Sequence, residues 1–276
     1  MSEDRSIVSA NGREIKIHSR QDFVAMRQAG LLAAEVLDFI TPHVQNGTTT
    51  EQLDTLCHDY IVGHDAIPAP LNYRGFPKSI CTSINHVVCH GIPGEKKLVE
   101  GDILNIDVTV IVNGWHGDSS RMFCIGKVPR KAARLVHLTY EAMMLGIAAV
   151  HPGATLGDIG YAIQNFAEKQ RCSVVRDFCG HGIGKIFHDA PSILHYGKPG
   201  TGIKLREGMF FTIEPMINLG RFEVKILNDG WTAVTKDRSL SAQFEHTIGV
   251  TSNGCEIFTS SPNGLDQPPY EQGRTY

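Results

Sequence analysis

The stretch Ile103-Leu-Asn-Ile-Asp-Val-Thr-Val-Ile-Val-Asn-Gly-Trp-His-Gly-Asp118 decides the fold class. Its residues alternate between two faces, which predicts a strand and places Asp107 and Thr109 on one face. Asn113-Gly114 predicts a two-residue hairpin turn, because both residues tolerate a positive φ. In that register Thr109 faces Asp118, so Asp107 and Asp118 are diagonal neighbours on one face. Two carboxylates that converge from apolar strands repel each other, and a proton or a metal ion usually compensates.

The composition is that of an ordinary globular protein of 276 residues, with 42% hydrophobic and 20% charged residues. A net charge of −3 argues against a dedicated nucleic-acid-binding protein. The seven cysteines form no CxxC pair, so neither a zinc finger nor a redox pair is indicated, and free thiols favour a reducing compartment. Residues 1–20 have no apolar signal region, and no apolar run approaches the roughly 18 residues of a membrane span. We therefore expect a cytoplasmic protein with no membrane partner.

An internal repeat organises the chain. Glu100-Gly-Asp-Ile-Leu-Asn-Ile-Asp107 matches Glu207-Gly-Met-Phe-Phe-Thr-Ile-Glu214 at an offset of 107, and Val44–Leu53 resembles Val150–Ile159 at an offset of 106. Each half reads as helix, capped helix, strand, and a Glu-Gly strand that ends in an acid. This pattern predicts one α+β domain with pseudo-two-fold symmetry, a central antiparallel sheet and outer helices.

The expected boundaries follow from the repeat. A polar lead-in covers residues 1–18, one catalytic domain covers 19–260 with halves of about 19–128 and 129–260, and a mobile tail rich in Pro and Gly covers 261–276. Four helices are expected from apolar stripes behind capping residues: one from Ser19 with Asp22, one from Thr48 with Glu51, one from Pro129 to about Ala149, and one from Thr155 with Asp158.

The repeat places Glu214 where Asp107 stands, so that a further acid points at the same centre. Glu245 adds an acid beside apolar strand positions, and the Gly-rich segment around His181 adds an imidazole whose neighbouring backbone can approach a ligand closely. Asp107, Asp118, His181, Glu214 and Glu245 together make an oxygen-dominated site that suits a pair of divalent ions such as Mn, Fe, Co or Zn. Two such ions, about 3.5–4 Å apart, can deprotonate a shared water and hold a carbonyl oxygen.

Each of these residues also has an ordinary structural interpretation. Asp118 could cap a turn, Glu214 could end a strand before Pro215, and His188 could be a structural hydrogen-bonding residue. Taken together, these interpretations leave several strand acids without counter-charges, which favours the metal site. His116 and His246 lie near the acids but are expected outside the ligand set.

At these residues the sequence resembles a known family. Phe178-x-Gly-His-Gly-Ile-Gly184, His188 and Ile193-Leu-His-Tyr196 resemble the motif of type I methionine aminopeptidases, and so does Val88-Cys-His-Gly-Ile-Pro93. The order Asp, Asp, His, Glu, Glu resembles that of the wider pita-bread metallohydrolases. The resemblance extends from about Ile15 to Phe258 and implies the pita-bread fold.

The resemblance also implies roles. The five-residue set would hold two divalent metal ions, with Asp118 and Glu245 bridging them. His90 and His188 would contact the scissile peptide, and Glu214 would relay a proton. A hydroxide bridging the ions would attack the scissile carbonyl. The methionine pocket of the family would be lined here by Tyr73, Phe76, Cys81, Phe187 and Trp231. Pro70 stands where some relatives carry a residue such as Cys, so the pocket wall there is not fixed by the resemblance.

The implied substrate is the N-terminal methionine of nascent polypeptides, followed by a small second residue. The absence of a Cys/His-rich extension in this sequence, and the 33 positions between His181 and Glu214, favour a minimal, bacterial-style enzyme. A monomer and a transient ribosome contact through Lys96-Lys97 or Lys127 to Lys131 are expected, although so small a charge cluster can equally be a solvated face. The alternatives are a prolidase or aminopeptidase P, which usually adds an N-terminal domain, and a binding module without catalysis, which typically lacks the metal ligands.

Overall fold

The computed structural model describes residues 6–8 and 12–270, and at its centre lies the expected hairpin of β6 (Ile103–Val112) and β7 (Trp115–Cys124). The turn residues Asn113 and Gly114 have φ values of 50° and 81°, as a two-residue turn of this kind requires. Thr109 pairs with Asp118 and Asp107 pairs with Ser120, so the predicted register is confirmed. The two aspartates are therefore diagonal neighbours on one face of the hairpin.

The hairpin is part of a nine-stranded antiparallel sheet within the described residues. The other strands of that sheet are β3 (Ile67–Pro68), β4 (Cys81–Ile84), β9 (Gly180–Gly182), β10 (Asp189–Ile193), β11 (Phe210–Ile213), β16 (Glu245–Val250) and β17 (Cys255–Ile257). The main path of the sheet runs β10-β9-β11-β16-β7-β6-β3, with β17 on β16 and β4 on β6. The β7–β16 pairing joins the first half of the chain to the second.

Smaller sheets surround this one. They are a pair of β1 (Ser6–Val8) and β2 (Glu14–Lys16), a sheet of β8 (Ser173–Val174), β12 (Met216–Asn218) and β15 (Ser241–Gln243), and a sheet of β5 (Val87–Cys89), β13 (Val224–Ile226) and β14 (Ala233–Thr235). In the last sheet, β13 and β14 form an antiparallel pair whose connection contains Asn228-Asp229-Gly230.

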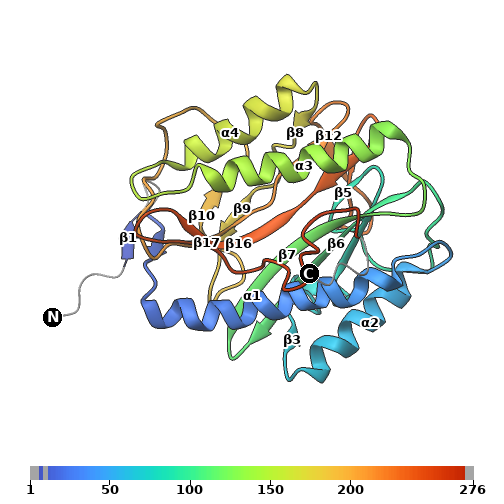
Figure 1. Ribbon diagram of the computed structural model, residues 1–276, viewed down its shortest axis with the longest axis horizontal. Helices are drawn as coiled ribbons and strands as arrows, with labels where there is room; N and C mark the ends of the chain where they lie inside the picture. Colours follow the sequence, from blue (N-terminus) through green and yellow to red (C-terminus); the bar gives the residue numbers. More distant parts are fainter. Residues whose placement is uncertain (1–5, 9–11, 271–276) are drawn as a thin grey trace.

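Four α-helices cover the sheet: α1 (Arg20–Ile40), α2 (Thr50–Gly63), α3 (Arg130–Ala148) and α4 (Leu156–Lys169). Short 3₁₀ turns at Thr41–His43 and Tyr73–Gly75 complete the helical elements of the described chain. Figure 1 shows α3 and α4 on one side of the strands and α1 and α2 on the other. None of the helices in residues 6–8 and 12–270 is long and apolar enough to cross a membrane.

The helix caps agree with the sequence at three of the four helices and differ at α2. Ser19 and Asp22 form a capping box on α1, and Thr155 and Asp158 form one on α4. The prediction for α2 is wrong by one residue, because Thr49 and Gln52 form its capping box. Thr48 instead donates its hydroxyl hydrogen to the carbonyl of His43, and Glu51 pairs with Lys78. The sequence allows two capping boxes one residue apart, Thr48 with Glu51 and Thr49 with Gln52, and the structure forms the second.

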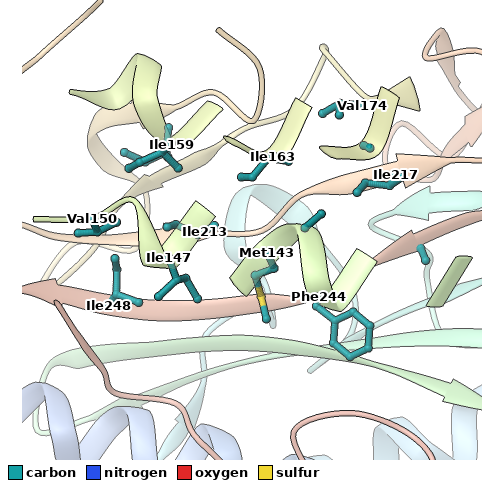
Figure 2. Packing of buried hydrophobic residues seen from close by; sticks show 14 of the residues in the cluster. Met143, Ile147, Val150, Ile159, Ile163, Val174, Ile213, Ile217, Phe244 and Ile248 are labelled. Atoms are coloured by element: carbon teal, nitrogen blue, oxygen red, sulfur yellow. The ribbon is translucent and has the colours of Figure 1, made fainter. Parts of the chain in front are cut away.

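The apolar core lies between the helices and the sheet. Figure 2 shows Met143 and Ile147 of α3 packing with Ile213, Phe244 and Ile248 from the region of β11 and β16. These residues are at most 5% exposed, and full burial of one such side chain stabilises a fold by about 1.5–3 kcal/mol. A matching cluster between α1, α2 and β6 fills the first half.

The internal repeat is visible in the backbone. Equivalent N–H groups donate to equivalent carbonyls in the two halves: Gly47 to Leu98 (2.8 Å) and Gly153 to Leu205 (2.9 Å), Gly101 to Ile125 and Gly208 to Val250 (2.9 Å each). All four glycines have φ between 90° and 96°, where other residues are strained. The predicted α+β architecture of two related halves is thus confirmed.

The C-terminal segment, which the sequence predicts to be a mobile tail, makes hydrogen bonds to the domain as far as residue 270. Ser261 and Asn263 donate hydrogen bonds to the buried Asp38 of α1, at 2.8 and 2.9 Å. The hydroxyl of Tyr270 donates to the carbonyl of Met122 at 2.7 Å. Residues 261–270 therefore pack against the domain, because their polar side chains complete hydrogen bonds that the body leaves open. The rest of the predicted tail, 271–276, lies outside the described residues, as do residues 1–5 and 9–11 of the predicted lead-in.

Candidate metal centre and substrate cavity

A cavity of about 340 Å³ opens at the centre of the sheet. Every residue that the sequence predicted for the site contributes to its lining: Tyr73, Phe76, Cys81, His90, Asp107, Asp118, His181, Phe187, His188, Glu214, Trp231 and Glu245. Residues separated by more than 170 positions in the sequence thus share one cavity.

The strand pairings bring the acids together. Asp107 and Asp118 come from the central hairpin, Glu214 directly follows β11, and Glu245 is the first residue of β16. Glu245 pairs with Ser120, two residues from Asp118. Ligand atoms of Asp118, His181 and Glu245 all lie within 4.8 Å of one another, which is close enough for one ion to bind all three.

The carboxylates lie in an environment that disfavours negative charge. Burial raises the pKa of Asp107 to about 7 and that of Glu214 to about 8. The pKa values of Asp118 and Glu245 are also raised well above the usual range, first by burial and then by the neighbouring carboxylates. Four carboxyl groups in one buried place need cations to ionise together.

Neutral hydrogen-bond donors hold two of these carboxylates in place. The hydroxyl of Thr109 donates to Asp118 Oδ1 at 2.7 Å, and the hydroxyl of Thr212 donates to Glu214 Oε1 at 2.7 Å. The backbone N–H of Glu214 donates to Nε2 of the buried His195 at 3.1 Å. The two hydroxyl bonds orient the carboxylate oxygens of Asp118 and Glu214 without neutralising their charge. The backbone bond holds the main chain at Glu214.

His181 presents a lone pair to the acids. Its Nδ1 lies 3.1 Å from the carbonyl oxygen of Gly182, which can only accept, so Nδ1 carries the hydrogen. Nε2 then faces Asp118 Oδ2 and Glu214 Oε1, each at 3.6 Å. Burial lowers the pKa of His181 to about 4, so the ring is neutral at pH 7 and Nε2 is free to bind a cation.

The donor set fits a divalent metal centre. It combines four carboxyl groups with one imidazole nitrogen, the mixture of ligands that Mn, Fe, Co and Zn accept. Among the cavity-lining residues, Arg74 is the one lysine or arginine, and it is exposed, with its guanidinium 5.2 Å from the ring centre of Tyr73. No lysine or arginine of the lining is therefore placed to compensate the buried acids, so protons or metal ions must do so.

Aromatic rings and histidines form the remaining wall. Tyr73 and Phe187 have ring centres 4.9 Å apart, and those of Phe76 and Trp231 are 5.2 Å apart. His90 lies 6.2 Å from the Trp231 ring and has a φ of 55°, a strained value for a non-glycine residue. This wall suits a flexible thioether, because sulfur makes favourable contacts with aromatic rings.

Comparison with known proteins agrees with this geometry. A model of the metallopeptidase family M24 matches residues 24–252. The chain belongs to metallopeptidase family M24. The methionine aminopeptidase of Rickettsia prowazekii is 66% identical over 257 residues, covering 93% of this chain and 99% of that protein. The methionine aminopeptidase of Escherichia coli K12 is 55% identical over 247 residues, covering 89% and 94% respectively.

Comparison with solved structures gives the same result. The crystal structure of the Rickettsia prowazekii methionine aminopeptidase superposes with a TM-score of 0.88 at 66% identity, covering 89% of this chain and 99% of that one. A prolidase from Pyrococcus furiosus reaches 0.68 at 19% identity and covers 88% and 65%, so it shares the fold alone. The resemblance to bacterial-style type I methionine aminopeptidases and the pita-bread fold are therefore confirmed.

Several residues that shape the site of this M24 metallopeptidase were missed by the sequence analysis. Gln243, 2% exposed, donates from Nε2 to Glu214 Oε2 at 3.3 Å, and Thr212 bonds the same carboxylate. Met216 and Cys179 add sulfur to the lining. The signal for Gln243 and Thr212 was the two-residue strand period, since each precedes a predicted metal ligand by two positions.

Proposed function

We propose that this M24 metallopeptidase removes the N-terminal methionine from nascent polypeptides, with a preference for a small second residue. The observation that carries the proposal is the convergence of the five predicted ligands in a cavity whose remaining wall is aromatic and sulfur-rich. A volume of about 340 Å³ is at the small end of ligand pockets, which suits one methionine side chain. The high identity to proteins named methionine aminopeptidase supports the same substrate.

Asp107, Asp118, His181, Glu214 and Glu245 would hold two divalent ions, with Asp118 and Glu245 shared between them. Bound there, the ions would polarise the scissile carbonyl and lower the pKa of a water molecule. Co, Mn, Fe and Zn all suit this donor set, so availability decides which is used.

The chain's own groups would carry the remaining roles. His188 would donate a hydrogen bond to the carbonyl oxygen as negative charge develops on it. His90 would contact the scissile nitrogen and orient the peptide. Glu214 would relay a proton to the leaving amine.

The test is a substrate comparison with the metal-loaded enzyme. Met-Ala peptides should release methionine, while Xaa-Pro peptides of equal length should remain intact. Preferential cleavage of the Xaa-Pro peptides would favour the prolidase alternative, and metal binding without any cleavage would favour a binding module.

Three further expectations belong to the proposal. The enzyme acts as a monomer, works in the cytoplasm, and contacts the ribosome transiently through Lys96-Lys97 or Lys127 to Lys131. Lys96 and Lys97 lie in an exposed segment before β6. Co-sedimentation with ribosomes should weaken when these lysines are replaced by glutamate, and unchanged co-sedimentation would remove this contact from the proposal.

A further inference from the structure

Two histidines lie side by side in the cavity but have different partners. The ring centres of His181 and His188 are 4.3 Å apart. His181 Nδ1 faces the carbonyl of Gly182, whereas His188 Nδ1 lies 3.0 Å from the hydroxyl of Tyr73. A carbonyl oxygen only accepts hydrogen bonds, but a phenol hydroxyl can also donate them.

The partner on Nδ1 decides which nitrogen of a neutral imidazole carries the hydrogen. A phenol is more acidic than a neutral imidazole N–H, and an unprotonated imidazole nitrogen is the stronger acceptor of the two. The favoured arrangement is therefore O–H of Tyr73 donating to Nδ1 of His188. The hydrogen of His188 then lies on Nε2.

We propose that Tyr73 is a positioning residue whose hydroxyl fixes His188 as the Nε2–H tautomer, the opposite of His181. His181, with its hydrogen on Nδ1, offers an Nε2 lone pair to a cation. His188, with its hydrogen on Nε2, offers an N–H to the substrate. This inference rests on the proposed function, in which His188 donates to the scissile carbonyl. Without the hydroxyl, His188 would populate both tautomers, and only one of them could donate from Nε2.

The local backbone supports a dedicated position for Tyr73. Both neighbours are non-glycine residues at positive φ: Asn72 at 66° and Arg74 at 48°. Strain of this kind costs about 1–3 kcal/mol per residue and persists mainly at functional sites. Hydrogen bonds across the turn hold it, with Tyr73 N donating to Pro70 O at 2.9 Å and Asn72 N donating to Phe76 O at 2.8 Å.

Ring packing also holds the Tyr73 and His188 side chains in place. The Tyr73 and His188 rings are stacked with centres 5.1 Å apart, and Phe187 lies 4.9 Å from Tyr73 and 4.0 Å from His188. The His116 ring also stacks on Phe187, with ring centres 5.5 Å apart. The hydroxyl and Nδ1 are thus held by contacts that do not depend on the hydroxyl, so Tyr73→Phe removes the hydrogen bond and keeps the ring.

The decisive experiment measures tautomers directly. Enzyme with ¹⁵N-labelled histidine, loaded with a diamagnetic divalent ion such as Zn, is recorded by long-range ¹H–¹⁵N correlation at pH 7.5. The His188 resonances are assigned by their loss in His188→Gln. Wild type should show His188 protonated at Nε2 and His181 at Nδ1. Tyr73→Phe should shift His188 towards a mixture and leave His181 unchanged.

Kinetics supply the second readout. Tyr73→Phe should lower kcat for Met-Ala peptides about tenfold, the equivalent of one hydrogen bond, with KM changed less than twofold. The matched control is Tyr60→Phe, which removes the hydroxyl of a tyrosine packed on Phe39 and His64 away from the cavity. It should change neither the His188 tautomer nor kcat.

The two hypotheses fail in different ways. A wild-type His188 protonated at Nδ1, or a tautomer unaffected by Tyr73→Phe, would overturn the role of Tyr73 even if methionine is released. An intact tautomer pattern in an enzyme that releases no methionine would instead overturn the proposed function.

Discussion

At the scale of single residues, Asp118 connects the two halves of the site. Its carboxylate accepts a hydrogen bond from Thr109 of its own hairpin, and its backbone carbonyl accepts one from Thr247 of β16. Its ligand atom belongs to the group of three within 4.8 Å, with His181 and Glu245, and that group does not include Asp107. We therefore propose that Asp118 would be shared by two metal ions and that Asp107 would contact one of them.

This difference predicts unequal effects of two substitutions. Asp118→Ala should lose both ions, and Asp107→Ala should retain a larger share of bound metal. The measurement is metal per chain by elemental analysis after gel filtration, with Asp177→Ala at the exposed edge of the cavity as the control. Equal metal content in the two variants would contradict the assigned division of labour.

The raised pKa values predict how stability depends on pH. A carboxyl whose folded-state pKa is raised binds its proton more tightly in the folded state than in the unfolded state. Below the ordinary values of 3.8 for Asp107 and 4.5 for Glu214, both states are protonated and there is no penalty. As the pH rises towards the folded values of about 7 and 8, the unfolded state releases protons first, so the free energy of unfolding falls.

The metal-free protein should therefore lose Tm between pH 5 and pH 8, and added Mn²⁺ should raise Tm more at pH 8 than at pH 6. Differential scanning calorimetry in matched buffers measures both. Asp107→Asn should flatten the decline in the metal-free protein. A Tm of the metal-free wild type that rises steadily to pH 8 would show that these carboxyl groups do not dominate the pH dependence.

At the scale of elements, the repeat gives two equivalent turns in different surroundings. Gly101 and Gly208 precede the β6 and β11 regions with φ of 96° and 90°. A Cβ on Gly101 would meet no atom within 4 Å, whereas one on Gly208 would lie 2.6 Å from the carbonyl oxygen of His18. The two glycines thus share a backbone conformation, but there is space for a side chain at Gly101 and none at Gly208.

Gly101→Ala should cost about 1–2 kcal/mol, the strain of the positive φ alone. Gly208→Ala should cost more, because the backbone of His18 must also move. Chemical denaturation of the two variants under one set of conditions compares them. Equal losses of stability would show that the backbone of His18 can move away from the new side chain at no cost in free energy.

Much of the arrangement of strands and helices was predictable from the sequence, because it depends on local patterns of residues. Alternation and Asn113-Gly114 fixed the hairpin and its register, and the matched Glu-Gly strands predicted the second half. The cap of α2 was misplaced since Thr48 and Thr49 offer the same local chemistry, and only the fold selects one. The strand period places Gln243 near the site, but it does not show the contact with Glu214, 29 positions away, on which the role of Gln243 depends.

At the scale of the whole molecule, the C-terminal segment packs on α1 and β7, two elements of the first half of the chain. Asp38 of α1 pairs with the buried Arg121 of β7 and also accepts from Ser261 and Asn263. Tyr270 packs on Phe123 with ring centres 5.1 Å apart. Composition predicted mobility for this segment because Pro, Gly and polar residues dominate it, and composition does not reveal that a buried aspartate provides the acceptor.

A chain ending at residue 260 should therefore be less stable by about 3 kcal/mol or more, since hydrogen bonds to a charged group are worth about 1.5–3 kcal/mol each. Metal content should stay unchanged, because the ligands lie elsewhere. Thermal unfolding with elemental analysis checks both, and a chain ending at residue 270 is the control. An unaltered Tm of the shorter chain would show that these contacts add nothing to stability.

The central claim is that the convergent acids, histidines and aromatic cavity make an enzyme that removes one N-terminal methionine. The most direct measurement is mass spectrometry of Met-Gly-Met-Ser incubated with the chain and Mn²⁺, Co²⁺ or Fe²⁺. The account predicts one methionine released per peptide, an intact Gly-Met-Ser product, and no release after chelation. Absence of release with every one of these ions, or continued removal of residues beyond the first, would contradict it.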